Sequence, residues 1–388
     1  MKKFELDWLG QYYAGAYTEF HNGSFSMTVN LKESLSLEKL QKANAKLREL
    51  HPYLSGRVKP TFFGYEYELT EKLLPLILTT DDSDIRNEQQ VFRVKYGEKH
   101  FTVEVTHTLC DGRTLASLTT HLLELYLGIE QPAPSPTNLE NAYERFATKT
   151  QKEIPKKKVT AYRPPLSMER VGKKTFNLSA SQLKEAANSN GATLSEYLLA
   201  LIFQSIEAER QTFKNENPVI ISVPVDCRSF FPSKTMRNFV DAISITMPES
   251  KNLSDMAKAL RRDFSKLGED FVGASFSATQ QTFNSVRYVP RFIKDMVMRL
   301  IKANKTVETT ATFSNVGKIS LKPEVLKQVD SMVFHINLDD GNPYCFSCVT
   351  VGDVLSLTVS LRGECVTLIQ ALEEKFFTYR THLLQPVA

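Results

Sequence analysis

Residues 91–126 change from the two-residue repeat of strands to the repeat of a helix, and this change restricts the possible folds more than any other feature of the sequence. Residues 91–96 and 101–107 are separated by a Gly-Glu turn, which is the pattern of a β-hairpin. One side of the second strand carries every other residue: Phe101, Val103, Val105 and His107. A run of leucines then follows Thr114, which can cap a helix. The sequence therefore predicts a strand that ends at a histidine, a short turn and a helix.

Further helices and strands are indicated along the rest of the chain. Helices are predicted from about Ser36 to His51 and Pro52, and from a capping box at 193–196 toward Phe213; strands are predicted at 219–225, around 333–337 and at 354–361, the last two joined by a turn at 340–343. Two proline-bearing stretches, 131–136 and 155–165, lack hydrophobic periodicity and divide the chain. We therefore expect a mixed α/β (α+β) fold of two lobes, residues 1–160 and 161–388.

The composition is that of a large globular chain. It has 388 residues, of which 42% are hydrophobic and 24% charged, and this is enough apolar material for a large core. Its 48 basic and 44 acidic residues give a net charge of +4, too nearly balanced for the continuous basic stripe of a nucleic-acid-binding protein. We therefore expect small-molecule partners and no nucleic acid.

The N-terminus and the cysteines indicate a cytoplasmic protein. Residues 1–7 are interrupted by acids and lack the apolar core of a signal peptide or membrane anchor, and no apolar run approaches the length of about 18 residues that spans a bilayer. Five cysteines, an odd number, predict reduced thiols. Cys345 and Cys348 form a lone CxxC without further ligands, so we interpret them as ordinary strand cysteines and not as a zinc or redox site.

His107 is the candidate for chemistry. A histidine that leaves a strand into an Asp-Gly turn is held by backbone on one side and open on the other. Its imidazole titrates near neutral pH, so it can take the proton from a hydroxyl or amine that attacks an acyl carbonyl. The sequence contains no GxSxG nucleophile elbow, which favours direct transfer over a covalent acyl-enzyme. The alternative is that His107 only ends a strand and that Asp111 and Gly112 only make a turn.

A second, partial match to the same spacing occurs at His335 and Asp339. The residue after Asp339 is Asp340 and not glycine, and a hairpin turn is enough to explain the two acids. We therefore expect a structural role for His335.

Several segments together resemble the chloramphenicol acetyltransferase-like superfamily, which includes alcohol acetyltransferases, plant BAHD acyltransferases and the condensation domains of nonribosomal peptide synthesis. These segments are, in chain order, 50–58, 107–112 (HTLCDG, the HxxxDG motif), 223–228, 237–240 and 312–317. The resemblance covers most of the chain. It implies a two-lobed fold with an active-site tunnel between the lobes.

The resemblance also implies roles for the matching residues. His107 would be the general base and would face a tunnel that admits an acyl thioester from one side and the acceptor from the other. Asp111 would be structural, pairing with Arg228 to brace the turn at Gly112 by a charge-assisted contact. A local pair between Asp226 and Arg228 is the competing prediction; the pair with Asp111 is preferred because a positioned base needs an anchor behind it.

Other matching residues are candidates for lining the tunnel or contacting substrate: Asn238, Ser314, Asn315 and Gly317. Two departures from the family pattern matter. The residue before His107 is Thr106, whereas condensation domains usually carry two adjacent histidines, and this favours simple O- or N-acyl transfer. The DFGWG loop of the plant enzymes is absent, and residues 314–318 stand in its place.

We therefore expect an acyltransferase that moves an acyl group from a thioester to an alcohol or amine. The preferred donor is acyl-coenzyme A, and the less favoured one is an acyl carrier protein. Neither a metal nor a bound cofactor is expected, since the thioester is a co-substrate. One alternative is a condensation-type enzyme that forms amides from carrier-protein thioesters. Another, from a different class, is a catalytically inactive binding or scaffold protein that retained the two-lobed fold.

Residues 290–305 carry an apolar stripe opposite a basic one. The apolar residues are Phe292, Ile293, Met296, Val297, Leu300 and Ile301, and the basic ones are Arg291, Lys294, Arg299 and Lys302. Such a helix suits a membrane surface, an acidic carrier protein or the phosphates of coenzyme A. The more usual arrangement, which we expect here, is a surface helix whose apolar side lies in the core, and peripheral membrane contact is the less favoured alternative.

Overall fold

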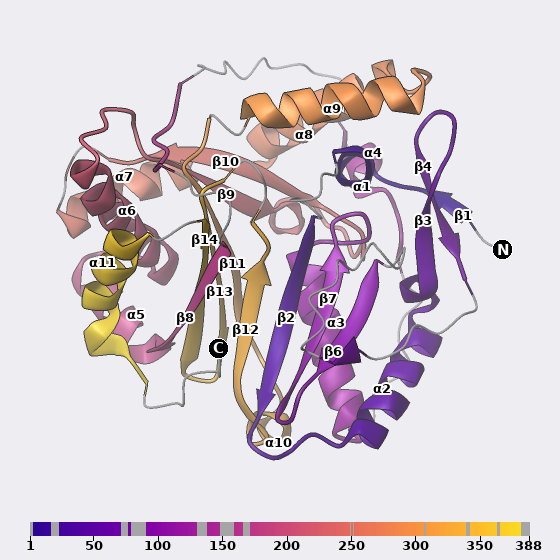
Figure 1. The fold of residues 1–388 in the computed structure, drawn as a ribbon, viewed down its shortest axis with the longest axis horizontal. Coiled ribbons are helices and arrows are strands. Elements are labelled where there is room, and N and C mark those ends of the chain that lie inside the picture. Colours follow the sequence, from indigo (N-terminus) through magenta and orange to yellow (C-terminus); the bar gives the residue numbers. More distant parts are fainter. Residues whose placement is uncertain are drawn as a thin grey trace.

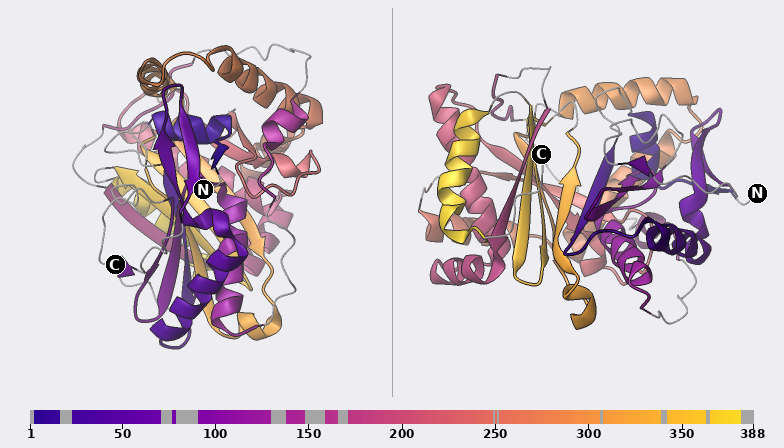
Figure 2. Two further views of the ribbon diagram at one scale, coloured as in Figure 1. Left: turned by 90° about the vertical axis from the view of Figure 1, so that its right-hand side faces the viewer. Right: turned by 60° about the horizontal axis from the view of Figure 1, so that its bottom comes forward.

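Two β-sheets stand side by side, each with helices on its outer side (Figures 1 and 2). The computed structural model describes residues 3–16, 23–70, 77–78, 91–129, 138–147, 159–165, 171–248, 250, 252–305, 308–338, 342–362 and 365–381. Helices α8 (Glu269–Ser285) and α9 (Arg291–Lys305) lie across one end of the molecule, at the top of Figure 1.

One sheet is built mainly from the first half of the chain. Its described strands are, in spatial order, β12 (Val329–Ile336), β2 (Ser24–Leu31), β7 (His100–Thr106), β6 (Phe92–Tyr96) and β5 (Ile77–Leu78). Neighbouring strands are antiparallel apart from β5 and β6. Helices α2 (Leu37–Leu50) and α3 (Gly112–Tyr126) bury leucines at helical spacing in the same core as this sheet: Leu40, Leu47, Leu115, Leu118 and Leu122.

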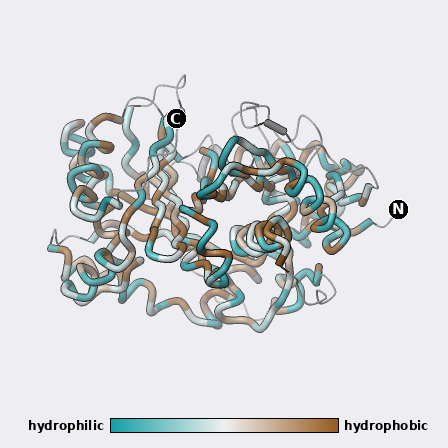
Figure 3. Tube along the Cα trace, turned by 90° about the horizontal axis from the view of Figure 1, so that it is seen from below, coloured by the Kyte–Doolittle hydropathy of each residue, from teal (hydrophilic) through white to brown (hydrophobic). Residues whose placement is uncertain are grey.

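The other sheet comes from the second half. Its described strands are, in spatial order, β10 (Val240–Thr246), β9 (Ile220–Asp226), β11 (Ala311–Ile319), β13 (Tyr344–Val351), β14 (Val354–Arg362) and β8 (Val171–Ser179). A second core lies between it and helices α5 (Ala180–Ser189), α6 (Leu194–Thr212), α7 (Leu253–Phe264) and α11 (Val366–Phe376). Figure 3 shows hydrophobic and hydrophilic residues alternating along the helices, as amphipathic packing requires.

Smaller elements complete the described part of the chain. A small sheet has the order β1 (Lys3–Glu5), β4 (Tyr65–Leu69) and β3 (Gly56–Pro60). The remaining helices are α1 (Trp8–Gly15), α4 (Ala142–Phe146) and α10 (Pro323–Leu326), with short 3-10 turns at Pro52–Ser55, Cys227–Ser229 and Phe377–Tyr379. Helix α1 contacts both α8 and α9.

Strand β12 joins the two sheets. It pairs with β2, although residues 329–336 belong to the lobe predicted from residue 161 onward. Hydroxyls of the other sheet reach it: Ser347 donates to the carbonyl of Phe334 at 2.7 Å, and Ser360 donates to that of Ile336 at 3.1 Å. The lobe boundary after residue 160 therefore stays a prediction. Strand β12 comes from the predicted second lobe but lies in the sheet of the first.

The local signals in the sequence predict the main elements well. Ser36 caps α2, residues 193–196 form the capping box of α6, and residues 91–107 contain the hairpin of β6 and β7. The predicted cap of α3 is wrong. Asp111 is the N-cap, and its carboxylate accepts the backbone N–H of Thr114 at 3.1 Å, so the helix begins three residues earlier than a cap at Thr114 would give.

Cys345 and Cys348 lie on β13, which confirms their assignment to a strand. The sequence analysis did not identify β13 as an element of its own. All eight of its residues are buried, so it lacks the alternation that marks a half-buried strand. All five cysteines are buried and free, and among the described residues no group of three or more side chains is arranged to hold a metal ion.

Helix α9 faces the opposite way from the prediction. Lys294 and Asp295 are buried, whereas Phe292 and Leu300 are 67% and 58% exposed, so the expectation that its apolar side lies in the core is wrong. The reason is that the polar side chains of α9 find partners within the protein, as described below. No helix in the described ranges is both long enough and apolar enough to cross a bilayer.

The capping box of α6 provides a test of the fold. Thr193→Ala removes the acceptor of the Glu196 backbone N–H at the start of a helix that is largely buried. We expect the free energy of unfolding to fall by about 1 kcal/mol in urea denaturation. Thr282→Ala removes an exposed hydroxyl of α8 that caps nothing, and should cost less than about 0.5 kcal/mol. Equal losses in the two variants would contradict the capping role.

Candidate active site

His107 lies immediately after β7, in the turn that leads to α3. Its backbone N–H donates to the carbonyl of Gly23 at 3.0 Å. Its ring stacks on Tyr13 of α1, with centroids 4.7 Å apart, and lies 4.3 Å from the ring of Phe25 on β2. The imidazole is therefore held between a helix and a strand, while the residue stays partly exposed.

Asn238, two residues before β10, contacts both the ring and the backbone of His107. Its Oδ1 lies 3.2 Å from His107 Nδ1, and its Nδ2 donates to His107 O at 2.7 Å and to Asp7 Oδ1 at 3.2 Å. Turning the amide over would put its oxygen against these two acceptors, so the partners fix its orientation. Oδ1 therefore accepts a hydrogen bond from Nδ1–H of the neutral ring, and Nε2 carries the lone pair.

Asp7 accepts a hydrogen bond from the side-chain amide of Asn238. It is the N-cap of α1, is 2% exposed and accepts the backbone N–H of Gly10 at 2.7 Å. Burial raises the pKa of Asp7, while the charge of Arg237, whose Nε lies 3.4 Å from Asp7 Oδ2, lowers it. The sequence analysis missed Asp7. The signal that could have marked it was its position as an N-cap before the run Trp8–Gly15.

Asp111 is fully buried and has three hydrogen-bond partners. Its carboxylate accepts from Thr114 N at 3.1 Å, from Phe239 N at 2.9 Å and from Arg228 Nη1 at 2.7 Å. The predicted ion pair between Asp111 and Arg228 is thus present. The competing pair is present too, because Arg228 Nη1 also lies 3.0 Å from Asp226 Oδ1.

Arg228 uses the rest of its guanidinium on backbone carbonyls. Nε and Nη2 donate to Thr235 O at 3.3 and 2.9 Å, and Nη2 donates to Arg237 O at 2.7 Å. These carbonyls belong to the segment that leads directly to Asn238. The ion pair with Asp111 therefore connects the turn after His107 to the segment that contacts its ring.

The electrostatics of this region favour a neutral imidazole. Burial lowers the pKa of His107 below its usual value of 6.5, against the opposing effects of the hydrogen bond with Asn238 and the charge of Asp111. At neutral pH the ring is then uncharged and Nε2 can accept a proton. Burial raises the pKa of the neighbouring Cys110 thiol, so it is not a thiolate nucleophile near neutral pH.

The remaining candidates lie on β11, beside the first turn of α3. Asn315 Nδ2 donates to Ser195 Oγ at 3.0 Å, and the Gly317 N–H donates to Asn315 Oδ1 at 2.8 Å in a bulge where Gly317 has φ +85°. The intervening Val316 approaches the motif: a Cβ on Gly112 would lie 3.7 Å from its Cγ2. The assignment of Ser314, Asn315 and Gly317 to a tunnel stays a prediction.

His335 lies on β12, opposite Ser26 of β2. Burial lowers its pKa to about 3, so the ring is neutral at physiological pH. Its spacing partners Asp339 and Asp340 lie outside the described residues, and its structural role stays a prediction.

The buried ion pair allows a double-mutant test. We expect Asp111→Asn and Arg228→Met each to lower the free energy of unfolding by about 3–5 kcal/mol. The first leaves the buried Arg228 with Asp226 alone as a counter-ion, and the second leaves the buried Asp111 without its arginine. The double variant should lose clearly less than the sum. As a control, Arg113→Ala removes a pair with Asp226 whose arginine is 62% exposed, and should cost less than about 1 kcal/mol. Additive losses at Asp111 and Arg228 would contradict the coupling.

Comparison with known proteins defines the fold. No protein-family model and no curated protein sequence matches the chain. Among solved structures it is similar to TRI101 of F. sporotrichioides in complex with coenzyme A and T-2, with a TM-score of 0.68 and 12% identity over 98% of this chain and 99% of that chain. It is also similar to polyketide synthase associated protein 5 from Mycobacterium tuberculosis (TM-score 0.61, 15% identity, 97% of each chain) and to the condensation domain of the monacolin K polyketide synthase MokA (TM-score 0.60, 12% identity, 97% and 96%). The chain therefore has the two-lobed chloramphenicol acetyltransferase-like fold, in agreement with the resemblance found in its sequence.

Proposed function

We propose that this protein is an acyltransferase in which His107 acts as the general base. The observation that carries the proposal is the contact between Asn238 Oδ1 and His107 Nδ1 at 3.2 Å, which selects the tautomer with its lone pair on Nε2. The fold adds support, because TRI101, which shares it, was solved with coenzyme A and a second small molecule. The donor we propose is acyl-coenzyme A, a co-substrate and not a bound cofactor.

The reaction needs one base and no covalent intermediate on the protein. Nε2 of His107 takes the proton from the hydroxyl or amine of the acceptor as that group attacks the thioester carbonyl. The tetrahedral intermediate then collapses, the bond from carbon to sulfur breaks, and the proton passes from His107 to the leaving thiolate. The products are an ester or amide and a free thiol, so atoms and charge balance and the imidazole returns to its neutral state.

Asn238 and Asp7 are positioning residues in this proposal. Asn238 holds Nδ1–H, and the carboxyl of Asp7 holds the amide of Asn238. A base that is aligned before substrate arrives does not need to reorganise during the reaction. The pair of Asp111 and Arg228 is structural support: it keeps the turn at Gly112 against the segment that carries Asn238.

The substrate passage belongs to the proposal as well. We assign it to a tunnel between an N-terminal lobe, 1–160, and a C-terminal lobe, 161–388. Its far wall would include Ser314, Asn315 and Gly317, because their strand contacts α3 beside Gly112.

A condensation-type reaction is the second candidate, since the condensation domain of MokA has a similar fold. Assays with free acyl-coenzyme A and with acyl carrier protein separate the two functions. We expect transfer from free acyl-coenzyme A to an alcohol or amine. Transfer from the carrier-bound thioester alone would replace this proposal with the condensation reaction, and a folded protein that uses neither donor would support the scaffold alternative.

The role of His107 is tested directly by substitution. We expect His107→Ala to lower kcat by about a hundred- to ten-thousandfold, the usual contribution of a general base, with little change in unfolding midpoint. His100→Ala is a matched control, because His100 begins the same strand at its opposite end, and should retain most of the turnover. Full activity of the His107 variant would end the proposal.

The role of Asn238 is tested by the pH profile. The hydrogen bond with Asn238 raises the pKa of His107, so Asn238→Ala should shift the acid limb of kcat/KM to lower pH and reduce kcat. Nitrogen NMR of His107 should show protonated Nδ1 in the parent and mixed tautomers in the variant. Asn30→Ala, which removes an amide that binds Ser331 on β12, should change neither readout. A loss of kcat with an unmoved acid limb and unchanged tautomer would contradict the positioning role.

A further inference from the structure

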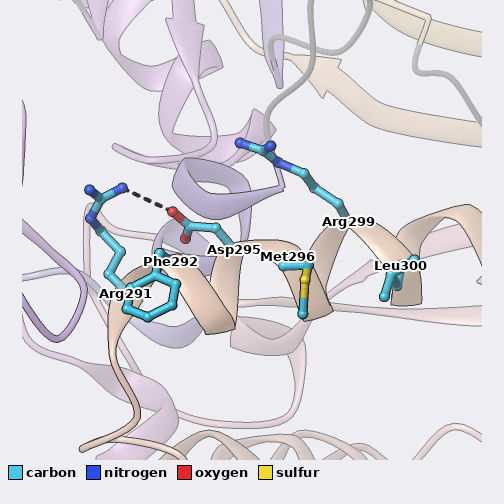
Figure 4. Close-up of a pocket in the computed structure, with 6 residues that line it drawn as sticks. All are labelled: Arg291, Phe292, Asp295, Met296, Arg299 and Leu300. Atoms are coloured by element: carbon cyan, nitrogen blue, oxygen red, sulfur yellow. Dashed lines mark hydrogen bonds and ion pairs between the residues drawn. The ribbon is translucent and has the colours of Figure 1, made fainter.

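Helix α9 presents a continuous apolar face to the solvent. Its exposed large hydrophobic residues are Phe292, Ile293, Met296, Val297 and Leu300. Figure 4 shows Phe292, Met296 and Leu300 following one another along the helix, where they line an open pocket together with Arg291, Asp295 and Arg299. In Figure 1 the helix lies lengthwise along the edge of the molecule.

Exposed aromatic residues outside α9 lie beside the start of the helix. Phe62 and Phe63, between β3 and β4, have ring centroids 4.9 Å apart, and Phe63 lies 6.0 Å from Tyr288, which is 77% exposed. The backbone N–H of Arg291 donates to Phe62 O at 2.8 Å, which ties the two elements together. We call the eight residues the α9 surface: Phe62, Phe63, Tyr288, Phe292, Ile293, Met296, Val297 and Leu300.

The orientation of α9 is fixed by its polar side. Lys294 Nζ donates to the carbonyls of Phe63 and, at 3.1 Å, of Arg287. The carboxylate of Asp295 accepts from Tyr65 Oη at 2.8 Å and from Arg291 Nη1 at 3.0 Å. Turning the helix inward would leave these groups without their partners, so the apolar face stays outside.

Close packing on α1 adds to this constraint. A Cβ on Gly15 of α1 would lie only 2.7 Å from Asp295 Oδ1 and 3.2 Å from the sulfur of Met298. Any larger residue at this position would require the side chains of Asp295 and Met298 to shift, so the two helices pack closely here. The exposed face is thus part of a tightly held unit.

The charge around the α9 surface selects its partner. In sequence, residues 287–305 contain six bases and a single acid, Asp295, so the segment carries a net positive charge. Arg287 pairs with Glu5 and Arg291 with Asp295, whereas Arg299 is exposed beside the apolar face. A second copy docked through the same face would bring these cations against each other. A polyanionic surface with an apolar interior satisfies both the cations and the apolar side chains.

We propose that the α9 surface docks the protein on an anionic lipid bilayer, with α9 lying in the plane of the interface. Aromatic and aliphatic side chains enter the boundary between head groups and acyl chains, and the flanking arginines contact the lipid phosphates. This surface is separate from the site at His107 and the inference does not rest on the proposed reaction.

Vesicle flotation of the full chain tests the proposal. We expect binding to vesicles of phosphatidylcholine and phosphatidylserine, and much weaker binding to phosphatidylcholine alone. Phe292→Glu and Leu300→Glu should each weaken binding about tenfold or more, because each replaces an apolar side chain that enters the bilayer when the protein binds. Arg299→Gln should weaken only the component that depends on phosphatidylserine, by about fivefold.

Phe377→Glu is the matched control. Phe377 is 70% exposed, like Phe292, but lies beyond α11 on another part of the molecule, so its variant should bind vesicles as the parent does. All four positions are exposed, and unfolding midpoints should agree. The proposal is overturned if the parent does not bind the anionic vesicles, if the α9 variants bind as tightly as the parent, or if sedimentation shows a dimer that Phe292→Glu dissociates.

Discussion

The site depends on the buried ion pair between Asp111 and Arg228. Removing two such charges from water costs several kcal/mol each, and only a complete set of hydrogen-bond partners offsets that cost. Here the set is complete: Asp111 accepts two backbone N–H groups besides Arg228, and Arg228 donates to Asp226 and to the carbonyls of two further residues. Because these partners come from both halves of the chain, the turn after β7 and the segment before β10 are held as one unit.

This unit sets the state of the imidazole. Arg228 donates hydrogen bonds to the segment that leads into Asn238. The amide of Asn238 contacts His107 and donates to Asp7 at the start of α1. Three parts of the chain, the turn after β7, the segment before β10 and the start of α1, thus favour the same tautomer of the His107 ring. Strand β12 connects the two sheets around this site, since it pairs with β2 and its carbonyls accept hydrogen bonds from Ser347 and Ser360 of the other sheet.

Sequence alone predicted those parts of the site whose residues form local patterns. A strand, a histidine and an aspartate four residues later are readable from spacing, and the resemblance to a known family supplied Arg228 as the partner. Asn238 was singled out only as a candidate for lining a tunnel, and Asp7 was missed. Their contact joins residues 231 positions apart, and such a pairing leaves no periodicity in either segment. Strand β13 was not predicted as a separate element for a related reason. A strand buried on both faces shows no alternation of apolar and polar residues.

Helix α9 shows a different limit of pattern reading. An amphipathic stripe fixes which residues share a face, but it does not say which face turns inward. That choice depends on whether the polar face finds partners, and in α9 Lys294 and Asp295 find them on the β3–β4 loop and β4. The apolar face is then left in water at a cost that grows with its area. The sequence of residues 287–305 is strongly basic, and the exposed Arg299 lies beside this apolar face. A partner that offers negative charge at its boundary and hydrocarbon behind it satisfies both features.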